Sequence, residues 1–173
     1  DVEKGEIFGL IGPNGAGKTT TFNMISGMLQ PDSGSILLEG SEIRSLPPHR
    51  RAALRIARTF QHVQLIPDAT VLENVTIGAH LRGRSGIPAA VLRLGYQRAE
   101  EARLFRIAAE SLDMMGLADL APRRVNELAY GLQRRVELAR AIAMDPKLLL
   151  LDEPAAGLND AETCLLYTSP SPR

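Results

Sequence analysis

A glycine-rich loop that contains one lysine lies near the start of the chain, where Gly12–Thr19 reads GPNGAGKT. This run fits the pattern G-x-x-x-x-G-K-[ST], in which backbone N–H groups point at phosphate oxygens and the lysine reaches the terminal phosphates. The motif requires a strand before the loop and a helix after it, and the apolar run Glu6–Ile11 and the helical spacing after Lys18 match that context. The loop therefore predicts a site for the phosphates of a nucleotide.

The predicted phosphate-binding residues are the loop and the hydroxyl residue that follows it. Lys18 would contact the β- and γ-phosphates as a compact charge, and the Thr19 hydroxyl would ligate Mg²⁺. Thr20 would assist through its hydroxyl or its backbone N–H. The full set comprises Gly12, Pro13, Asn14, Gly15, Ala16, Gly17, Lys18, Thr19 and Thr20.

Two adjacent carboxylates, Asp152 and Glu153, end a second apolar run, in which Leu148–Glu153 reads LLLLDE. Ligands of an open parallel sheet bind at the carboxyl ends of its strands, so these acids are expected at the nucleotide site. Asp152 would hold Mg²⁺ through a water molecule, and Glu153 would orient or deprotonate the water that attacks the γ-phosphate. Together with the glycine-rich loop, the pair predicts a P-loop NTPase.

Short apolar runs alternate with helical spacing along the chain. The runs Glu6–Ile11, Ser35–Glu39 and Lys147–Leu151 predict strands, and a further strand-like step falls at 57–61. Because helices separate buried strands, the sequence predicts an α/β fold.

Helical spacing accounts for the segments between these runs. Phe22, Ile25 and Leu29 predict a helix after the glycine-rich loop, and a basic helical segment is expected to run from Pro47 towards Arg58. Helical periodicity dominates residues 71–144, so the middle of the chain is predicted to be a helical insert. One face of its long helix would carry Leu104, Ile107, Ala108, Ser111 and Met115.

The stretch Leu128–Arg135, LAYGLQRR, resembles the signature of the ABC ATPase family, which usually reads LSGGQ and opens a helix. The resemblance implies a P-loop NTPase fold with a mainly parallel core sheet, a small antiparallel β part and a helical insert. It also implies a head-to-tail dimer in which Ala129, Tyr130 and Gly131 contact the ATP of a partner subunit. Ala129 replaces the serine whose hydroxyl contacts the γ-phosphate, so an inactive signature is the alternative.

Further stretches resemble the ATPase subunits of branched-chain amino acid importers. In Arg58–Gln61, RTFQ, the resemblance assigns Gln61 to contact with Mg²⁺ and the attacking water. Three more runs look like the same subgroup: LPPHR at 46–50, TVLENV at 70–75 and PAAGLN at 154–159. The implied function is ATP binding and hydrolysis that drives solute import, with Glu153, Gln61 and Lys18 as catalytic residues.

The resemblance also implies a domain organisation. Residues 1–61 would form the first part of the P-loop core, 62–130 the helical subdomain, and 131–163 the second part of the core. Residues 164–173 read CLLYTSPSPR and resemble the translated adapter of a sequencing library, so they are left out of the fold prediction. The family's adenine-stacking aromatic residue and switch histidine would lie before and after this sequence, which predicts weak ATP binding and negligible turnover for these residues alone.

Charge and composition limit the partners of the chain. Lysine plus arginine and aspartate plus glutamate number 20 each, so no net field would hold the chain on nucleic acid or an anionic membrane. No apolar stretch approaches the roughly 20 residues that span a bilayer, and the single cysteine allows no internal disulfide. A solvated helix face is favoured over a nucleic-acid contact for the basic run of Arg44, Arg50, Arg51, Arg55 and Arg58.

The resemblance supplies the expected partners. A second ABC ATPase subunit would complete the dimer, and transmembrane permease subunits would contact the helical subdomain. The protein would then be cytoplasmic and peripheral on the inner face of the cell membrane. Two alternatives stay open: a soluble ABC ATPase that acts on ribosomes or DNA, and a nucleotide-binding subunit that does not hydrolyse ATP.

Overall fold

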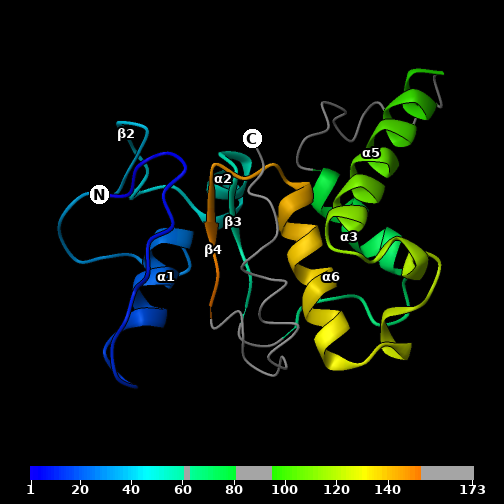
Figure 1. The fold of residues 1–173 in the computed structure, drawn as a ribbon. Helices are drawn as coiled ribbons and strands as arrows, with labels where there is room; N and C mark the ends of the chain where they lie inside the picture. Colours follow the sequence, from blue (N-terminus) through cyan, green and yellow to red (C-terminus); the bar gives the residue numbers. More distant parts are fainter. Residues whose placement is uncertain (61–62, 81–94, 153–173) are drawn as a thin grey trace. The chain divides into compact units, whose positions relative to one another are not determined.

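The computed structural model describes residues 1–60, 63–80 and 95–152, and the chain divides into two compact units, Asp1–Arg51 and Ala52–Arg173 (Figure 1). The first unit contains helix α1 (Lys18–Ser26) and strands β1 (Leu37–Leu38) and β2 (Ser41–Glu42), and the boundary between the units falls within helix α2 (Pro48–Ala53). The second unit contains β3 (Ile56–Arg58), α3 (Val71–Ala79), α5 (Gly95–Met114), η2 (Ala118–Leu120), η3 (Val125–Glu127), α6 (Tyr130–Ala143) and β4 (Leu148–Leu150).

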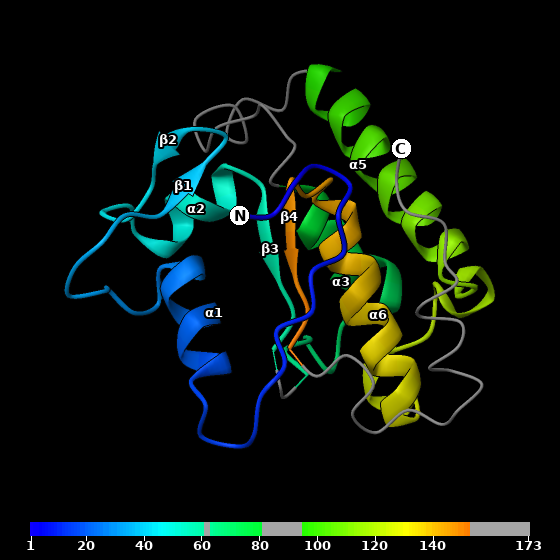
Figure 2. The ribbon, with the colours of Figure 1, turned by 60° about the vertical axis from the view of Figure 1, so that its left-hand side comes forward.

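Strands β1 and β2 form a tight antiparallel hairpin in the first unit (Figure 2). The register pairs Leu38 with Ser41. The two residues between them, Glu39 and Gly40, have positive φ angles of 50° and 79°, which is typical of a type I′ turn and favours glycine. The hairpin confirms the small antiparallel β part, and β1 lies inside the strand predicted at 35–39.

A fully buried arginine, Arg51, connects the segments of the first unit. Its guanidinium donates hydrogen bonds to the carbonyl oxygens of Met24 and Ile25, in the last turn of α1. Helix ends leave such carbonyls without partners in the helix, so a buried cation stabilises them. The same guanidinium donates to the carbonyl oxygens of Arg44, at 2.6 Å, and Leu46, at 2.9 Å. Arg51 therefore ties the end of α1 to the chain after the hairpin.

Helix α1 ends at Ser26 and is capped by Gly27, earlier than the apolar spacing predicted. Gly27 has a φ of 82°, and its N–H donates to the carbonyl oxygen of Met24. A Cβ at this position would lie 2.8 Å from Nε of Arg51, so both the backbone conformation and the packed guanidinium require glycine. Leu29 lies beyond this cap, which shortens the helix relative to the prediction.

The basic segment that follows the hairpin also differs from its prediction. Helix α2 ends at Ala53 instead of running towards Arg58, because Arg55 adopts a positive φ of 67° before the chain enters β3. The predicted solvated face is wrong for two of its residues. Arg51 is 0% exposed, and the side chain of Arg58 is 7% exposed. Both guanidinium groups bind protein oxygens inside the fold.

Residues 6–11 do not form the predicted buried strand. Within the described chain this segment lies outside every helix and strand, and Ile7 and Ile11 are 93% and 94% exposed. A strand buried on both faces is stabilised by paired strands beside it and helices over it. The first unit offers only the two-residue strands of its hairpin. The apolar run therefore has no parallel sheet to join within its own unit.

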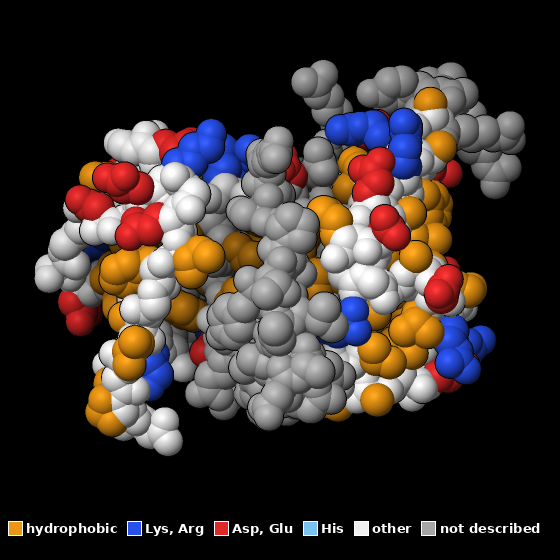
Figure 3. Space-filling model, in the orientation of Figure 1, with side chains coloured by type: hydrophobic (Ala, Val, Ile, Leu, Met, Phe, Trp, Pro, Cys, Tyr) orange, Lys and Arg blue, Asp and Glu red, His pale blue; other side chains and the backbone are white. Residues whose placement is uncertain are grey.

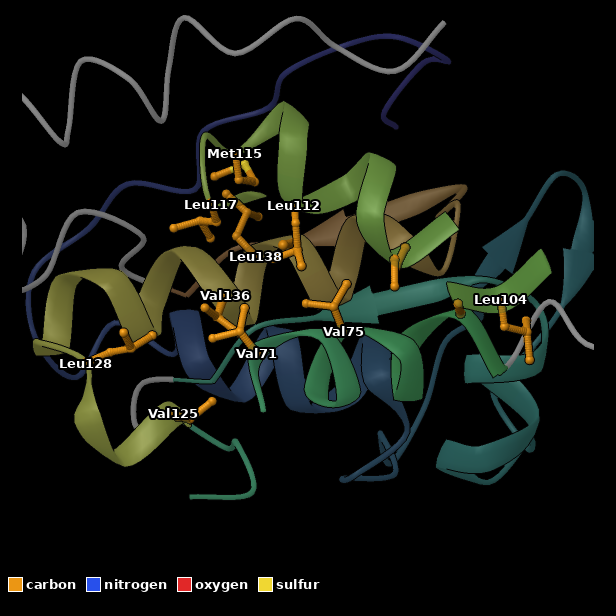
Figure 4. Packing of buried hydrophobic residues seen from close by; sticks show 14 residues of the cluster. Val71, Val75, Leu104, Leu112, Met115, Leu117, Val125, Leu128, Val136 and Leu138 are labelled. Carbon is orange, nitrogen blue, oxygen red and sulfur yellow. The ribbon is translucent and has the colours of Figure 1, made fainter. Parts of the chain in front are cut away.

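Helices α3, α5 and α6 enclose the apolar core of the second unit (Figure 4). Leu104, Ala108 and Leu112 of α5 are four residues apart and fully buried, so they form one face of the helix. The predicted face of the long helix is confirmed, with Ile107 partly buried at its margin. The buried cluster comprises Val71, Val75, Ala79, Leu104, Ala108, Leu112, Met115, Leu117, Val125, Leu128, Val136, Leu138, Ala139 and Ala143.

Helix α3 begins with a capping box and approaches α6 closely. The Thr70 hydroxyl accepts a hydrogen bond from the N–H of Glu73 at 3.1 Å, and the Glu73 carboxylate accepts one from the N–H of Thr70 at 2.7 Å. Near the other end of the helix, a Cβ on Gly78 would lie 2.1 Å from the carbonyl oxygen of Arg140 in α6. Glycine at this position therefore permits the two helices to pack.

Strands β3 and β4 pair in parallel, with Ile56 opposite Leu148 and Arg58 opposite Leu150. The helices of the second unit lie between these strands in the sequence. This arrangement confirms the α/β fold, the parallel core and the strand predicted at 147–151. The paired carboxyl ends bring the residues after Arg58 and those after Leu150 to one edge.

The described part of the chain contains no helix that combines the length and the apolarity needed to cross a bilayer. Acidic and basic side chains lie interspersed on the visible surface of each unit (Figure 3). This mixture agrees with the equal numbers of acidic and basic residues in the sequence.

Candidate functional site

The glycine-rich loop closes around the ammonium group of Lys18. Its Nζ donates hydrogen bonds to the carbonyl oxygens of Gly12, at 2.6 Å, and Pro13, at 2.9 Å. The N–H of Ala16 donates to the carbonyl oxygen of Pro13 at 3.2 Å, and Gly15 has a φ of 85°. The loop is therefore a tight turn with a positive charge held against it, which is the arrangement that phosphate binding requires.

Helix α1 directs its N-terminal end at the same loop. Gly17 is the N-cap residue, with a φ of 84° and no side-chain oxygen to occupy the free N–H groups of the first turn. Thr19 and Thr20 are exposed in that turn, which contains no acidic residue. The hydroxyl of Thr21 donates back to the carbonyl oxygen of Gly17 at 3.1 Å. An open positive helix end of this kind suits an anion.

The conformation of the loop also favours glycine at three of its positions. A Cβ on Gly12 would lie 3.0 Å from the Cβ of Ala16, so a side chain there would push the loop open. Gly15 and Gly17 have space around them, but their positive φ angles favour glycine. These residues fit the phosphates of a nucleotide.

Asp152 lies just beyond β4, at the carboxyl end of the parallel strand pair, and is 9% exposed. Its Oδ2 is 3.2 Å from Nη2 of Arg58. Its N–H donates to the hydroxyl of Thr59 at 3.4 Å, and the N–H of Thr59 donates to the carbonyl oxygen of Leu150 at 3.0 Å. Carboxylate oxygens are preferred ligands of Mg²⁺, so Asp152 fits a metal ligand by its chemistry, and Arg58 is the cation that it faces in this structure.

Helix α6 begins within the predicted signature, as the sequence indicated. Ala129 is the N-cap residue and makes no side-chain capping hydrogen bond. Tyr130 is 46% exposed, and Gly131 lies in the first turn. The start of α6 is therefore a second helix end with backbone N–H groups and no lysine of its own in the first turn.

A buried ion pair connects α6 with the chain after β3. Nη1 of Arg134 is 3.0 Å from Oε2 of Glu137, and the two side chains are 5% and 2% exposed. Oε1 of Glu137 accepts from the N–H groups of Phe60, at 3.5 Å, and Gln64, at 3.4 Å. Arg134 also donates to the carbonyl oxygen of Phe60, and its Cζ lies 5.6 Å from the ring centroid of Tyr130. The signature helix is thus fixed to the end of β3.

The structure describes only some of the predicted site residues, and these residues belong to two separate units. Gln61 and Glu153 lie outside the described residues, so their roles stay predictions. Lys18 and Thr19 belong to the first unit and Asp152 to the second, and each unit is described by itself. The two motifs are therefore each well formed locally, and their shared site stays a prediction.

Three charged residues beside these motifs were not predicted. Arg134 and Glu137 stand three residues apart among apolar residues of one helix, and this spacing could have indicated a buried pair. No sequence pattern could have indicated the pairing of Arg58, because its partner Asp152 is 94 positions away in the sequence.

A family model described as ABC transporter matches residues 1–156. The chain is 45% identical over 159 residues to the high-affinity branched-chain amino acid transport ATP-binding protein LivG of Escherichia coli K12, covering 91% of this chain and 62% of LivG. It is 43% identical over 162 residues to BraF of Pseudomonas aeruginosa, which has the same description, covering 94% of this chain and 64% of BraF. The chain thus spans less than two thirds of these curated relatives.

Two solved structures are similar in fold. The ADP conformation of MJ1267, an ATP-binding cassette of an ABC transporter, has a TM-score of 0.78 and 33% identity, covering 97% of this chain and 65% of that chain. The dimeric structure of MJ0796, a bacterial ABC transporter cassette, has a TM-score of 0.78 and 28% identity, covering 96% of this chain and 68% of that one. The same MJ0796 has been solved in a post-hydrolysis state bound to ADP and Pi.

Proposed function

Because the chain belongs to the ABC transporter family, we propose that it binds and hydrolyses ATP as the nucleotide-binding subunit of a branched-chain amino acid importer. The observation that carries this proposal is the glycine-rich loop, where the ammonium group of Lys18 and the open end of α1 both suit phosphate oxygens. The choice of solute rests on the likeness to LivG and BraF, which are described as serving branched-chain amino acid transport.

The reaction needs the two motifs in one site. Lys18 would bind the β- and γ-phosphates, and Glu153 would orient or deprotonate the attacking water. Thr19, Gln61 and Asp152 would hold Mg²⁺, which would neutralise charge on the phosphate oxygens. Oxygen ligands of this kind suit a hard divalent cation, and the buried carboxylate of Asp152 supports the assignment.

A second copy or a related subunit would complete the nucleotide site. The start of α6, with Ala129, Tyr130 and Gly131, offers backbone N–H groups to an anion but no lysine in its first turn. A phosphate bound elsewhere would therefore have to be brought to it by a partner. MJ0796 is described as dimeric, which supports a pair of subunits. The head-to-tail arrangement, in which each signature would face the partner's ATP, is part of the proposal.

The remaining partners would be membrane subunits. We assign residues 62–130 to a helical subdomain that contacts transmembrane permease subunits, between core segments at 1–61 and 131–163. This arrangement would place the protein in the cytoplasm, at the inner face of the cell membrane.

One observation favours a second candidate, a subunit that binds ATP without hydrolysing it. Ala129 leaves the N-cap of α6 without any side-chain hydrogen bond, where the usual signature has a serine hydroxyl. The presence of Lys18, Asp152 and Glu153 supports hydrolysis instead. Phosphate release separates the two candidates, since both predict ATP binding.

Binding of a fluorescent ATP analogue tests the phosphate site directly. We expect Lys18→Ala to weaken binding about tenfold or more, because hydrogen bonds to charged groups contribute about 1.5–3 kcal/mol. Lys4→Ala, which removes an exposed lysine of the same unit, is the matched control and should leave binding unchanged. Equal binding by both variants would remove the basis of the proposal.

Glu153→Gln tests hydrolysis in the protein assembled with its permease subunits. We expect the variant to retain ATP, to accumulate as a closed dimer and to stop both phosphate release and uptake of labelled leucine into vesicles. Hydrolysis at the normal rate in this variant would contradict the role of Glu153. An unaltered chain that binds ATP and dimerises but releases no phosphate would support the second candidate.

A further inference from the structure

The carboxylate of Asp152 forms a buried ion pair with the guanidinium group of Arg58. Nη2 of Arg58 lies 3.2 Å from its Oδ2, and the two side chains are 7% and 12% exposed. A buried carboxylate that lacks a partner is strongly unfavourable, so a pair of this kind is stabilised by its mutual contact. Arg58 therefore neutralises Asp152 in the absence of any metal ion.

The backbone fixes this pair at the end of the strands. Arg58 is opposite Leu150 in the parallel register, so Asp152 follows two residues beyond the paired position. The hydroxyl of Thr59 accepts from the N–H of Asp152 at 3.4 Å. The two strand ends are thus held together by contacts that do not depend on the ion pair.

The guanidinium group is also held from a second side. Cζ of Arg58 lies 5.2 Å from the ring centroid of Phe60, a distance typical of a cation–π contact. An arginine placed by both an aromatic ring and a carboxylate has little freedom to leave the site. Its positive charge therefore stays near Asp152 when a second cation approaches.

We propose that Arg58 competes with Mg²⁺ for Asp152 and so sets the metal affinity of the nucleotide site. The inference rests on the proposed function, in which Asp152 contributes to binding Mg²⁺ with the nucleotide. A guanidinium 3.2 Å from one carboxylate oxygen repels a divalent cation near the other oxygen and shares the same negative charge. Arg58 is therefore a positioning residue that keeps metal binding weak until the nucleotide phosphates add their own negative charge.

The test is a titration of Mg²⁺ at a fixed concentration of a fluorescent ADP analogue, using the whole chain. We expect Arg58→Gln to lower the Mg²⁺ concentration at half-saturation about tenfold, which is about 1.4 kcal/mol. Arg58→Lys keeps the positive charge but not the planar group that lies over Phe60, so it should lower the midpoint less than Arg58→Gln does. An unchanged or higher midpoint in Arg58→Gln would overturn the proposal.

A matched control lies at the other end of the same two strands. Arg55 pairs with Asp145 at 2.5 Å, just before β3 and β4, and both side chains are more than two fifths exposed. Arg55→Gln should therefore leave the Mg²⁺ midpoint unchanged. A shift equal to that of Arg58→Gln would mean that general loss of positive charge, and not the contact with Asp152, controls the metal.

A second measurement needs no variant and remains informative if Arg58→Gln fails to fold. In the unaltered chain, NMR signals of the Arg58 guanidinium should move when Mg²⁺ and ADP are added together and stay in place with Mg²⁺ alone. Unmoved signals in a saturated sample would refute the competition. If the unaltered chain binds no nucleotide at all, the proposed function fails first, and this outcome differs from nucleotide binding without any response of Arg58.

Discussion

The two units of the molecule are stabilised in different ways. In the first unit the buried residues are Ile43 and Arg51, and the arginine binds four backbone carbonyl oxygens. The second unit has a continuous apolar cluster between α3, α5 and α6. Polar contacts to the backbone thus organise one unit, whereas apolar packing organises the other.

This difference shows what each unit needs from its sequence. A phosphate-binding loop keeps its N–H groups directed at a ligand, so apolar cover over the loop would exclude the phosphates. Buried hydrogen bonds, such as those from Arg51 to the end of α1, can hold the neighbouring helix without covering its N-terminal end. The second unit instead buries one face of each of its helices α3, α5 and α6 against the others.

The largest expected effect comes from the apolar core. Leu112 is 0% exposed and Leu37 of the first unit is 61% exposed, so the same change to alanine compares the two units. We expect Leu112→Ala to lower the free energy of unfolding by about 2–5 kcal/mol and Leu37→Ala by less than about 0.5 kcal/mol. Urea unfolding followed by circular dichroism measures both values. Similar losses of unfolding free energy in the two variants would contradict the view that apolar packing stabilises mainly the second unit.

The next effect concerns the buried arginine of the first unit. Arg51→Met keeps much of the volume but removes the hydrogen bonds that the guanidinium donates to the carbonyl oxygens of Met24 and Ile25. We expect local stability to fall by about 2–4 kcal/mol, because each unsatisfied buried acceptor costs about 1–3 kcal/mol. Amide hydrogen exchange in α1 should then be about a hundredfold faster. Arg50→Met, on the exposed neighbour, should leave exchange unchanged.

The same contrast explains which parts of the fold could be predicted. Apolar residues of α5 repeat every four positions, so the sequence itself displays the buried face of Leu104 and Ala108. Arg51 binds backbone carbonyl oxygens, which every residue type has, so no pattern of letters indicates its burial. Residues 6–11 carry a strand pattern, but the pattern cannot say whether a sheet is available beside it.

In the candidate site, too, features formed by neighbouring residues in the sequence could be predicted, and contacts between distant residues could not. The glycine-rich loop was predictable because its chemistry lies within eight consecutive residues and depends on its own backbone. The start of α6 was predictable from the resemblance of its motif. The pair of Arg58 and Asp152 was not, because strand register, and not sequence spacing, brings the two residues together.

A smaller effect probes how closely the helices of the second unit pack. A Cβ on Gly78 would lie 2.1 Å from the carbonyl oxygen of Arg140, so α3 and α6 would have to separate. We expect Gly78→Ala to destabilise the protein by about 1–3 kcal/mol in thermal unfolding. Alanine normally stabilises a helix relative to glycine, so Ala109→Gly on the exposed face of α5 should also destabilise, by about 1 kcal/mol. A stabilising Gly78→Ala would show that the helices pack less tightly than the structure indicates.

The smallest effect concerns a polar feature of the second unit, the capping box of α3. Hydrogen bonds from the Thr70 N–H and hydroxyl lower the pKa of the Glu73 carboxyl below its ordinary value. A lowered pKa contributes stability that is complete above the ordinary value and is lost as the pH falls through the folded value. We expect Thr70→Ala to lower the free energy of unfolding by about 1 kcal/mol at pH 7.

Acid should reduce this difference without abolishing it. The hydroxyl of Thr70 also accepts from the N–H of Glu73, and this bond does not require the carboxylate charge. Urea unfolding of the unaltered chain and of Thr70→Ala at pH 7 and at about pH 3 should therefore show a smaller gap in acid. Alanine keeps the backbone N–H that donates to Glu73, so a gap that is equal at both pH values would mean that the bond from the Thr70 hydroxyl to the carboxylate contributes nothing.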